Sequence, residues 1–98
     1  MEINKSVEND VLTVALSGRL DTTTAPELEA ALSGEYANCK GLIMNFENLE
    51  YISSAGLRVL LAAQKATAAN GGLIVRGANE EIKEVFDITG FSDILNIE

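Results

Sequence analysis

The sequence predicts an α/β fold, a mixed and mostly parallel sheet of four or five strands covered by helices. Three observations indicate it. Two segments that alternate apolar and polar side chains come first and predict an N-terminal β-hairpin. Short apolar runs follow, which are typical of buried strands, and segments with helical periodicity separate these runs. A chain of 98 residues is expected to form one domain, residues 1–98, with a modest core.

The first part of the chain predicts two strands and a helix. Residues 3–7 and 12–17 alternate in polarity, which is typical of the two strands of a hairpin. Thr24 and Glu27 have the spacing of a capping box, which predicts the start of a helix. Apolar positions within residues 28–32 share one face of that helix at the i, i+3, i+4 spacing.

The second part predicts alternating strands and helices. Residues 41–46 form a nearly continuous apolar run, as in a buried central strand. Residues 57–64 carry a strong helical pattern, and residues 73–75 form another short apolar run. Asn79 is placed to cap a third helix, and residues 94–97 are expected as a last short strand.

The chain is strongly acidic, because 15 acidic residues against seven basic ones give a formal charge of −8. Such a surface repels nucleic acid, so we expect no direct DNA or RNA binding. The charge suits a basic protein partner, and it would equally serve solubility alone. No segment approaches the roughly 20 apolar residues of a membrane span, the first residues lack the charged-then-apolar layout of a signal peptide, and Cys39 is the only cysteine. We therefore expect a cytoplasmic protein without membrane insertion.

The absence of histidine argues against most enzyme classes. It removes the Ser-His-Asp and Cys-His nucleophile systems and most catalytic zinc sites. Gly71 and Gly72 follow a helix and precede a strand, the reverse of a phosphate-binding loop, so a nucleotide-binding domain has little support. Cys39 is interpreted as structural, and Glu47 and Glu50 as part of a solvated face. We expect no enzymatic activity, no metal and no cofactor.

Ser53 and Ser54 lie between strand-like and helix-like segments. The first amides of a helix have no partner within it, and the helix dipole is positive there, so anions are favoured. A phosphate on either serine would add about −1.5 to −2 charges and three acceptor oxygens. From the residues alone an N-cap is the simpler explanation, and either serine is a candidate for that cap.

Three segments resemble the STAS domain family, which includes bacterial anti-sigma factor antagonists. Tyr51-Ile52-Ser53-Ser54-Ala55-Gly56-Leu57 resembles the central motif of that family, usually Asp-Ser-Ser/Thr-Gly-Leu after an apolar pair. Ser17-Gly18-Arg19-Leu20-Asp21, with Thr24-Ala25 opening a helix, resembles its Gly-x-Leu-Asp segment, and residues 84–91 resemble its later helix. The resemblance implies a STAS-type single domain in which three or more helices pack mainly on one face of a mixed, mostly parallel sheet.

The resemblance also implies a function. In the family, the serine directly after the motif aspartate, here Ser54, is phosphorylated by a kinase that is also the anti-sigma factor. The unphosphorylated antagonist binds this kinase and frees the sigma factor for transcription. The phosphorylated form is released, and a serine phosphatase resets it. We expect the partner to contact the residues around the motif, namely Asp21, Thr22, Thr23, Thr24, Ser53, Ser54, Gly56 and Arg58.

Two positions depart from the family pattern. Ser53 stands where the family usually has aspartate, which makes Ser53 the alternative phosphoacceptor. Arg58 replaces a residue that is often glycine, and a cation there suits either a phosphate or a partner contact. The alternative function is a STAS scaffold that is not phosphorylated, as a subunit of a lipid-transport or stressosome-like complex. Asp21 and the threonines 22–24 have plain alternative roles in a turn and a helix cap.

Overall fold

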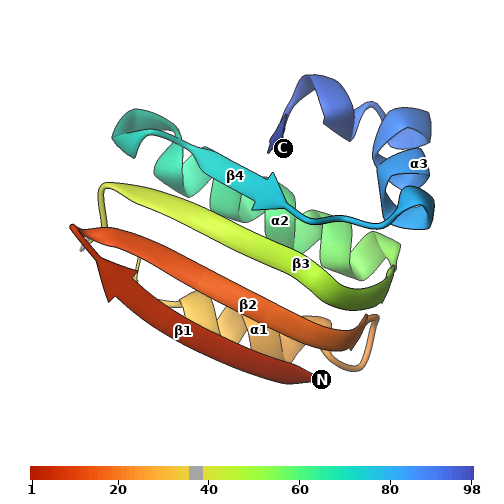
Figure 1. The fold of residues 1–98 in the computed structure, drawn as a ribbon, viewed down its shortest axis with the longest axis horizontal. Coiled ribbons are helices and arrows are strands. Elements are labelled where there is room, and N and C mark those ends of the chain that lie inside the picture. The colour runs from red at the N-terminus through yellow and green to blue at the C-terminus, as the bar shows by residue number, and fades with distance from the viewer. Residues whose placement is uncertain (36–38) are drawn as a thin grey trace.

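In the computed structural model, which describes residues 1–35 and 39–98, five strands form one sheet in the order β1-β2-β3-β4-β5 (Figure 1). β1 and β2 are antiparallel, and all later neighbours are parallel. The strands are β1 Glu2–Glu8, β2 Val11–Leu20, β3 Gly41–Ile52, β4 Leu73–Arg76 and β5 Asn96–Ile97. The predicted mixed sheet with an N-terminal hairpin is confirmed.

Within the described residues, three α-helices connect the parallel strands. They are α1 (Ala25–Leu32), α2 (Ser54–Thr67) and α3 (Glu80–Thr89), and the short 3-10 turns η2 (Ala68–Asn70) and η3 (Phe91–Asp93) follow α2 and α3. Figure 1 shows α1 and α2 behind the sheet, and α3 at the carboxyl end of β4. The helices thus pack mainly on one face, as expected. In the ranges that the structure describes, no helix is long and apolar enough to cross a membrane.

Side-chain alternation directs one face of the sheet toward α1 and α2. The register aligns Leu12 with Leu42 and Leu42 with Leu73, and all three side chains are buried. Thr13 and Ile43 are also aligned, but they lie on the opposite face and are only partly buried. Burial of each such leucine stabilises the fold by roughly 1.5–3 kcal/mol. The helices complete the core with Leu28 and Leu32 of α1, Leu60 of α2, and Ile82 and Phe86 of α3.

β3 is longer than the apolar run that predicts it. The sequence pattern predicts a strand over residues 41–46, whereas β3 continues to Ile52. In this second half the buried positions, Leu49 and Ile52, are three residues apart instead of two. The register against β2 shifts twice within residues 15–19. Because such bulges break the period of two, alternation in the sequence does not reveal this half of the strand.

The start of α3 lies where the sequence predicts it. Asn79 Oδ1 accepts a hydrogen bond from the Ile82 N–H at 2.8 Å, so the predicted N-cap is confirmed. Gly90 ends the helix in the left-handed region, with φ at 82°. The last strand, β5, occupies the second half of the predicted segment 94–97.

Candidate functional site

The candidate site lies where β2 and β3 end. Because these strands are parallel, their carboxyl ends meet at one edge of the sheet, and the chain leaves each strand toward a helix (Figure 1). The backbone N–H of Ser53 donates to the carbonyl of Leu20 at 2.9 Å. This bond joins the last residue of β2 to the start of α2. The turn formed by residues 21–24 therefore begins beside residues 53–54.

Asp21 organises the turn before α1. Its Oδ1 accepts hydrogen bonds from the backbone N–H groups of Thr23 and Thr24, each at 3.0 Å. Thr24 Oγ1 accepts from the N–H of Asp21 at 2.8 Å and donates to the carbonyl of Arg19 at 2.7 Å. The predicted capping box of Thr24 and Glu27 is wrong, because the Thr24 hydroxyl is used within the turn and makes no cap on α1.

Hydrogen bonds also keep Asp21 ionised. The backbone N–H of Thr24 is the main cause that holds the pKa of the Asp21 carboxyl below its usual value of 3.8, and this outweighs the opposing effect of desolvation. The N–H of Thr23, the Thr24 hydroxyl and the charge of Arg19 lower this pKa further. Arg19 Nε lies 4.0 Å from Asp21 Oδ2. The turn therefore presents a fixed negative charge beside a cation.

Arg19 and Tyr51 belong to this neighbourhood, although sequence reasoning did not single them out. The register places Arg19 of β2 opposite Tyr51 of β3. The Arg19 guanidinium carbon lies 4.2 Å from the centroid of the Tyr51 ring, a cation–π contact. The two residues are 32 positions apart along the chain, and only the bulged register aligns them.

The structure distinguishes the two serines. Ser53 is the N-cap of α2: its backbone is extended and its Oγ accepts from the N–H of Gly56 at 3.4 Å. Ser54 is the first residue of the helix and is exposed. Within residues 1–35 and 39–98, no hydrogen bond engages the Ser54 hydroxyl. The cap is therefore Ser53, and Ser54 presents a free hydroxyl to solvent.

Gly56 is buried beneath this surface. A Cβ at this position would lie 2.7 Å from Leu20 Cγ and 2.9 Å from Ile52 Cγ1, which is far inside van der Waals contact. Only glycine lets α2 start this close to β2 and β3. Gly56 was expected among the residues that contact a partner, but the structure buries it where the helix packs against the strands.

Arg58 is an exposed cation one turn further along α2. Together with Thr22 it lines a cleft of about 230 Å³ between α1 and α2, whose walls include Ala55 and Val59. In the described part of the chain, no carboxylate pairs with Arg58. The residues that the sequence predicts to contact a partner, apart from the buried Gly56, are called the docking surface below: Asp21, Thr22, Thr23, Thr24, Ser53, Ser54 and Arg58.

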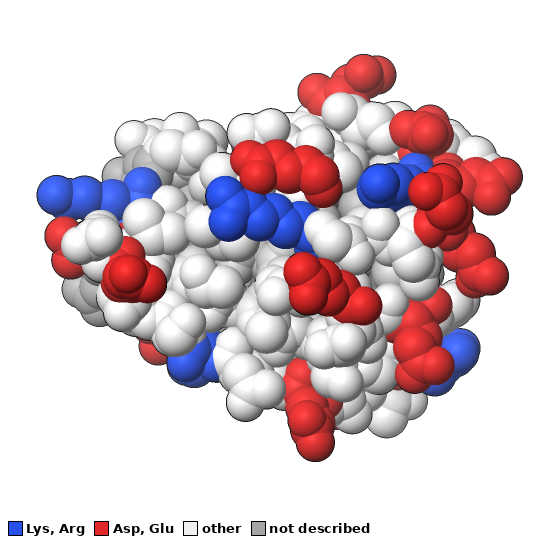
Figure 2. All heavy atoms as spheres, in the orientation of Figure 1, with Lys and Arg blue, Asp and Glu red and all other residues white. Residues whose placement is uncertain are grey.

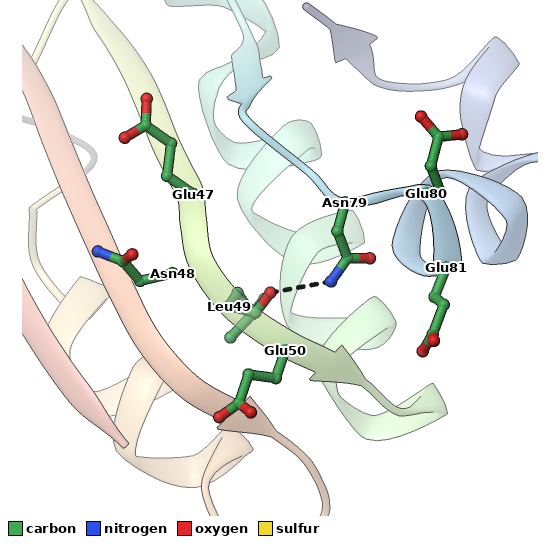
Figure 3. Close-up of a pocket in the computed structure, with 7 residues that line it drawn as sticks. All are labelled: Glu47, Asn48, Leu49, Glu50, Asn79, Glu80 and Glu81. Atoms are coloured by element: carbon green, nitrogen blue, oxygen red, sulfur yellow. Dashed lines mark hydrogen bonds between the residues drawn. The ribbon is translucent and has the colours of Figure 1, made fainter.

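A larger cleft lies elsewhere, between the second half of β3 and the start of α3. It has a volume of about 550 Å³ and is lined by Glu47, Asn48, Leu49, Glu50, Asn79, Glu80 and Glu81. Figure 3 shows the four carboxylates pointing in different directions, while Asn79 Nδ2 donates to the Leu49 carbonyl at 3.2 Å. Among the described residues no group of three potential ligands is arranged to hold a metal ion. The cleft agrees with the interpretation of Glu47 and Glu50 as a solvated face.

Negative charge is unevenly spread over the molecule. Figure 2 shows the sheet face that α1 and α2 leave uncovered, with acidic side chains gathered around α3 and few basic ones among them. Four acidic residues of α3 contribute: Glu80, Glu81, Glu84 and Asp87. With a formal charge of −8, the protein favours association with basic surfaces.

Comparison with known proteins adds a family and two named relatives. The STAS domain model matches residues 2–98. The anti-sigma-B factor antagonist of Staphylococcus aureus is 29% identical over 99 residues, which span 99% of this chain and 92% of that protein. The structure of the anti-sigma factor antagonist SpoIIAA in its unphosphorylated form matches with a TM-score of 0.79 and 20% identity, over 99% of this chain and 87% of that one.

A second SpoIIAA structure, from Bacillus, is of the phosphorylated form. It matches with a TM-score of 0.77 and 21% identity, over 99% of this chain and 91% of that one. At these identities the two SpoIIAA structures show a shared fold.

Proposed function

Since the chain belongs to the STAS domain family, we propose that it is an anti-sigma factor antagonist whose binding is switched by phosphorylation of Ser54. The named relatives support the general role, because the similar staphylococcal protein and SpoIIAA both carry the name of anti-sigma factor antagonist. The partner is an anti-sigma factor that is also a serine kinase. This role is regulatory rather than catalytic, and it is exercised in the cytoplasm.

The observation that carries the proposal is the state of the two motif serines. Ser53 is partly buried and its Oγ accepts the Gly56 amide, whereas the Ser54 hydroxyl is exposed and free within the part of the chain that the structure describes. A kinase therefore reaches Ser54 without removing the cap of α2. This favours Ser54 over Ser53 as the acceptor.

The switch works through charge. The kinase transfers the γ-phosphoryl group of ATP to Ser54 Oγ, the hydroxyl proton is released and ADP leaves. The phosphate adds about −1.5 to −2 charges to the docking surface, which already carries the ionised Asp21. Contacts that suit a neutral hydroxyl then become repulsive or lose their fit, and the partner dissociates. A serine phosphatase restores the binding form.

Paired variants of Ser54 test this switch. Anti-sigma factors with a serine-kinase domain that are encoded in the same genome are titrated with the unmodified protein, Ser54→Ala and Ser54→Asp. We expect Ser54→Ala to bind and to stay bound when ATP is added, and Ser54→Asp to bind at least tenfold more weakly. Ser53→Thr, which keeps a capping hydroxyl, is the matched control and should be released by ATP. Equal binding of Ser54→Ala and Ser54→Asp contradicts the proposal.

A second candidate is a STAS scaffold without phosphoregulation, in a lipid-transport or stressosome-like complex. The observation that favours it is Ser53, which occupies the position where the family usually has an acidic residue. Mass spectrometry after incubation with the same kinases and ATP separates the two. Phosphate mapped to Ser54 supports the switch, and absence of phosphate from both Ser53 and Ser54 supports the scaffold.

A further inference from the structure

Arg58 and Ser54 occupy neighbouring positions on one face of α2. Ser54 is the first residue of the helix and Arg58 follows it by four residues, and both are exposed. Side chains four residues apart on a helix face one another, with Cβ atoms about 5–6 Å apart. An acidic group followed by a basic group four residues later is the favourable order. A phosphate on Ser54 would therefore lie within reach of the guanidinium.

The guanidinium is available for such a pair. Arg19 and Arg76 each have a carboxylate partner, Asp21 and Glu98, whereas no carboxylate in the described residues pairs with Arg58. Glu29 lines the same cleft from α1 but makes no ion pair with it. Within the described residues, Arg58 therefore has no ion pair that must first be broken.

Arg58 lines the cleft between α1 and α2 together with Thr22 and Ala55. It is also the only basic side chain among the lining residues of that cleft, all of which lie in the described ranges. A partner that docks on this cleft therefore meets one positive charge there.

We propose that Arg58 binds the phosphate of phosphorylated Ser54, and that this pair withdraws the guanidinium from the cleft between α1 and α2. The inference rests on the phosphorylation of Ser54 proposed above. Phosphorylation then changes the docking surface twice, because it adds a dianion at Ser54 and removes the cation from the cleft. Guanidinium groups match phosphate oxygens with two parallel hydrogen bonds, which lysine does not reproduce.

The pair is measured directly when phosphoserine is incorporated at position 54 by an expanded genetic code, so that no kinase is needed. The second pKa of the phosphate is followed by phosphorus NMR in the otherwise unchanged protein and in Arg58→Gln, Arg58→Lys and Lys65→Gln. Lys65 is the matched control, because it is an exposed cation in the last turn of the same helix. All four forms should fold, since both cations are exposed.

We expect the phosphate pKa to be lower by about 0.4 unit with Arg58 present than in Arg58→Gln, since an i, i+4 ion pair of about 0.5 kcal/mol corresponds to that shift. Arg58→Lys should lie between the two, and Lys65→Gln should match the unchanged protein. The same phosphate pKa in Arg58→Gln and the unchanged protein overturns the inference.

The failure of this inference is distinguishable from failure of the proposed function. If the phosphate pKa depends on Arg58 but the kinases never phosphorylate Ser54, the ion pair is supported and the proposed function fails. If the protein is phosphorylated and released but its phosphate pKa is the same without Arg58, the proposed function is supported and the ion pair fails.

Discussion

The backbone N–H of Ser53 donates a hydrogen bond to the carbonyl of Leu20, at 2.9 Å. This contact joins the end of β2 to the start of α2, although the two residues are 33 positions apart in the chain. It sets the Asp21 turn beside Ser54, and the docking surface depends on that placement.

The cap of α2 should depend on Ser53 and be independent of Ser54. Ser53→Ala removes the Oγ that accepts the Gly56 amide, and loss of an N-cap costs about 1 kcal/mol of the free energy of unfolding. Ser54→Ala removes a hydroxyl without a partner in the described residues and should change this free energy by less than ~0.5 kcal/mol. Urea denaturation of the two variants checks the difference. Equal loss of stability would show that both serines cap the helix.

Gly56→Ala should be strongly destabilising. The added methyl group would lie 2.7 Å from Leu20 Cγ, and overpacking of this kind costs about 1–3 kcal/mol. Ala62→Ser, at an exposed position of the same helix, is the control and should be nearly neutral. In a Leu20→Ala background the penalty of Gly56→Ala should shrink, because Leu20 Cγ, the nearest clashing atom, is gone. A penalty that is the same in both backgrounds would exclude Leu20 as its cause.

The stability of the turn before α1 should depend on the Thr24 hydroxyl. Thr24→Val removes the donor to the Arg19 carbonyl and the acceptor for the Asp21 N–H, so we expect a loss of about 1–2 kcal/mol in the free energy of unfolding. Thr23→Val is the matched control, because the Thr23 hydroxyl has no hydrogen bond within the described residues. Chemical denaturation compares the two. If Thr23→Val is as damaging as Thr24→Val, the exchange of a hydroxyl for a methyl group in this turn, rather than the loss of these hydrogen bonds, is the cause.

Asp21 should make the free energy of unfolding depend on pH under acidic conditions. Its pKa is lowered from 3.8 in the folded protein, chiefly by the Thr24 amide, so the folded state favours the ionised form. The stabilisation is therefore fully present above the unfolded value of 3.8 and is lost as the pH falls through the lowered folded pKa. An NMR titration of the Asp21 carboxyl carbon should give a value below 3.8.

The contribution of Asp21 to this pH dependence of stability can be isolated with the variant Asp21→Asn. The difference in the free energy of unfolding between the unchanged protein and this variant should be constant near neutral pH and should shrink below pH 3.8. A difference that stays constant through the acidic range would contradict the lowered pKa. Glu27→Gln, at an exposed position of α1, is the control.

Much of the fold was predictable because its signals are local. Period-2 alternation located the hairpin, apolar runs located the first half of β3 and β4, and Asn79 marked the start of α3. The Thr24–Glu27 capping box failed for a physical reason. The motif describes which hydrogen bonds a threonine is able to make, whereas the nearby Arg19 carbonyl and Asp21 amide determine which ones it makes.

By itself the sequence determined the order of strands and helices, the acidic charge, the lack of histidine and the presence of two serines at a helix start. These are properties of composition and of short-range periodicity. Only the tertiary structure decided that Ser53 is the cap, that the Ser54 hydroxyl has no hydrogen bond within the described residues, that Gly56 is buried, and that the Asp21 turn begins beside them. Those facts depend on how β2 and β3 align through two register shifts, and contacts between segments some 30 residues apart leave no periodic trace in the chain.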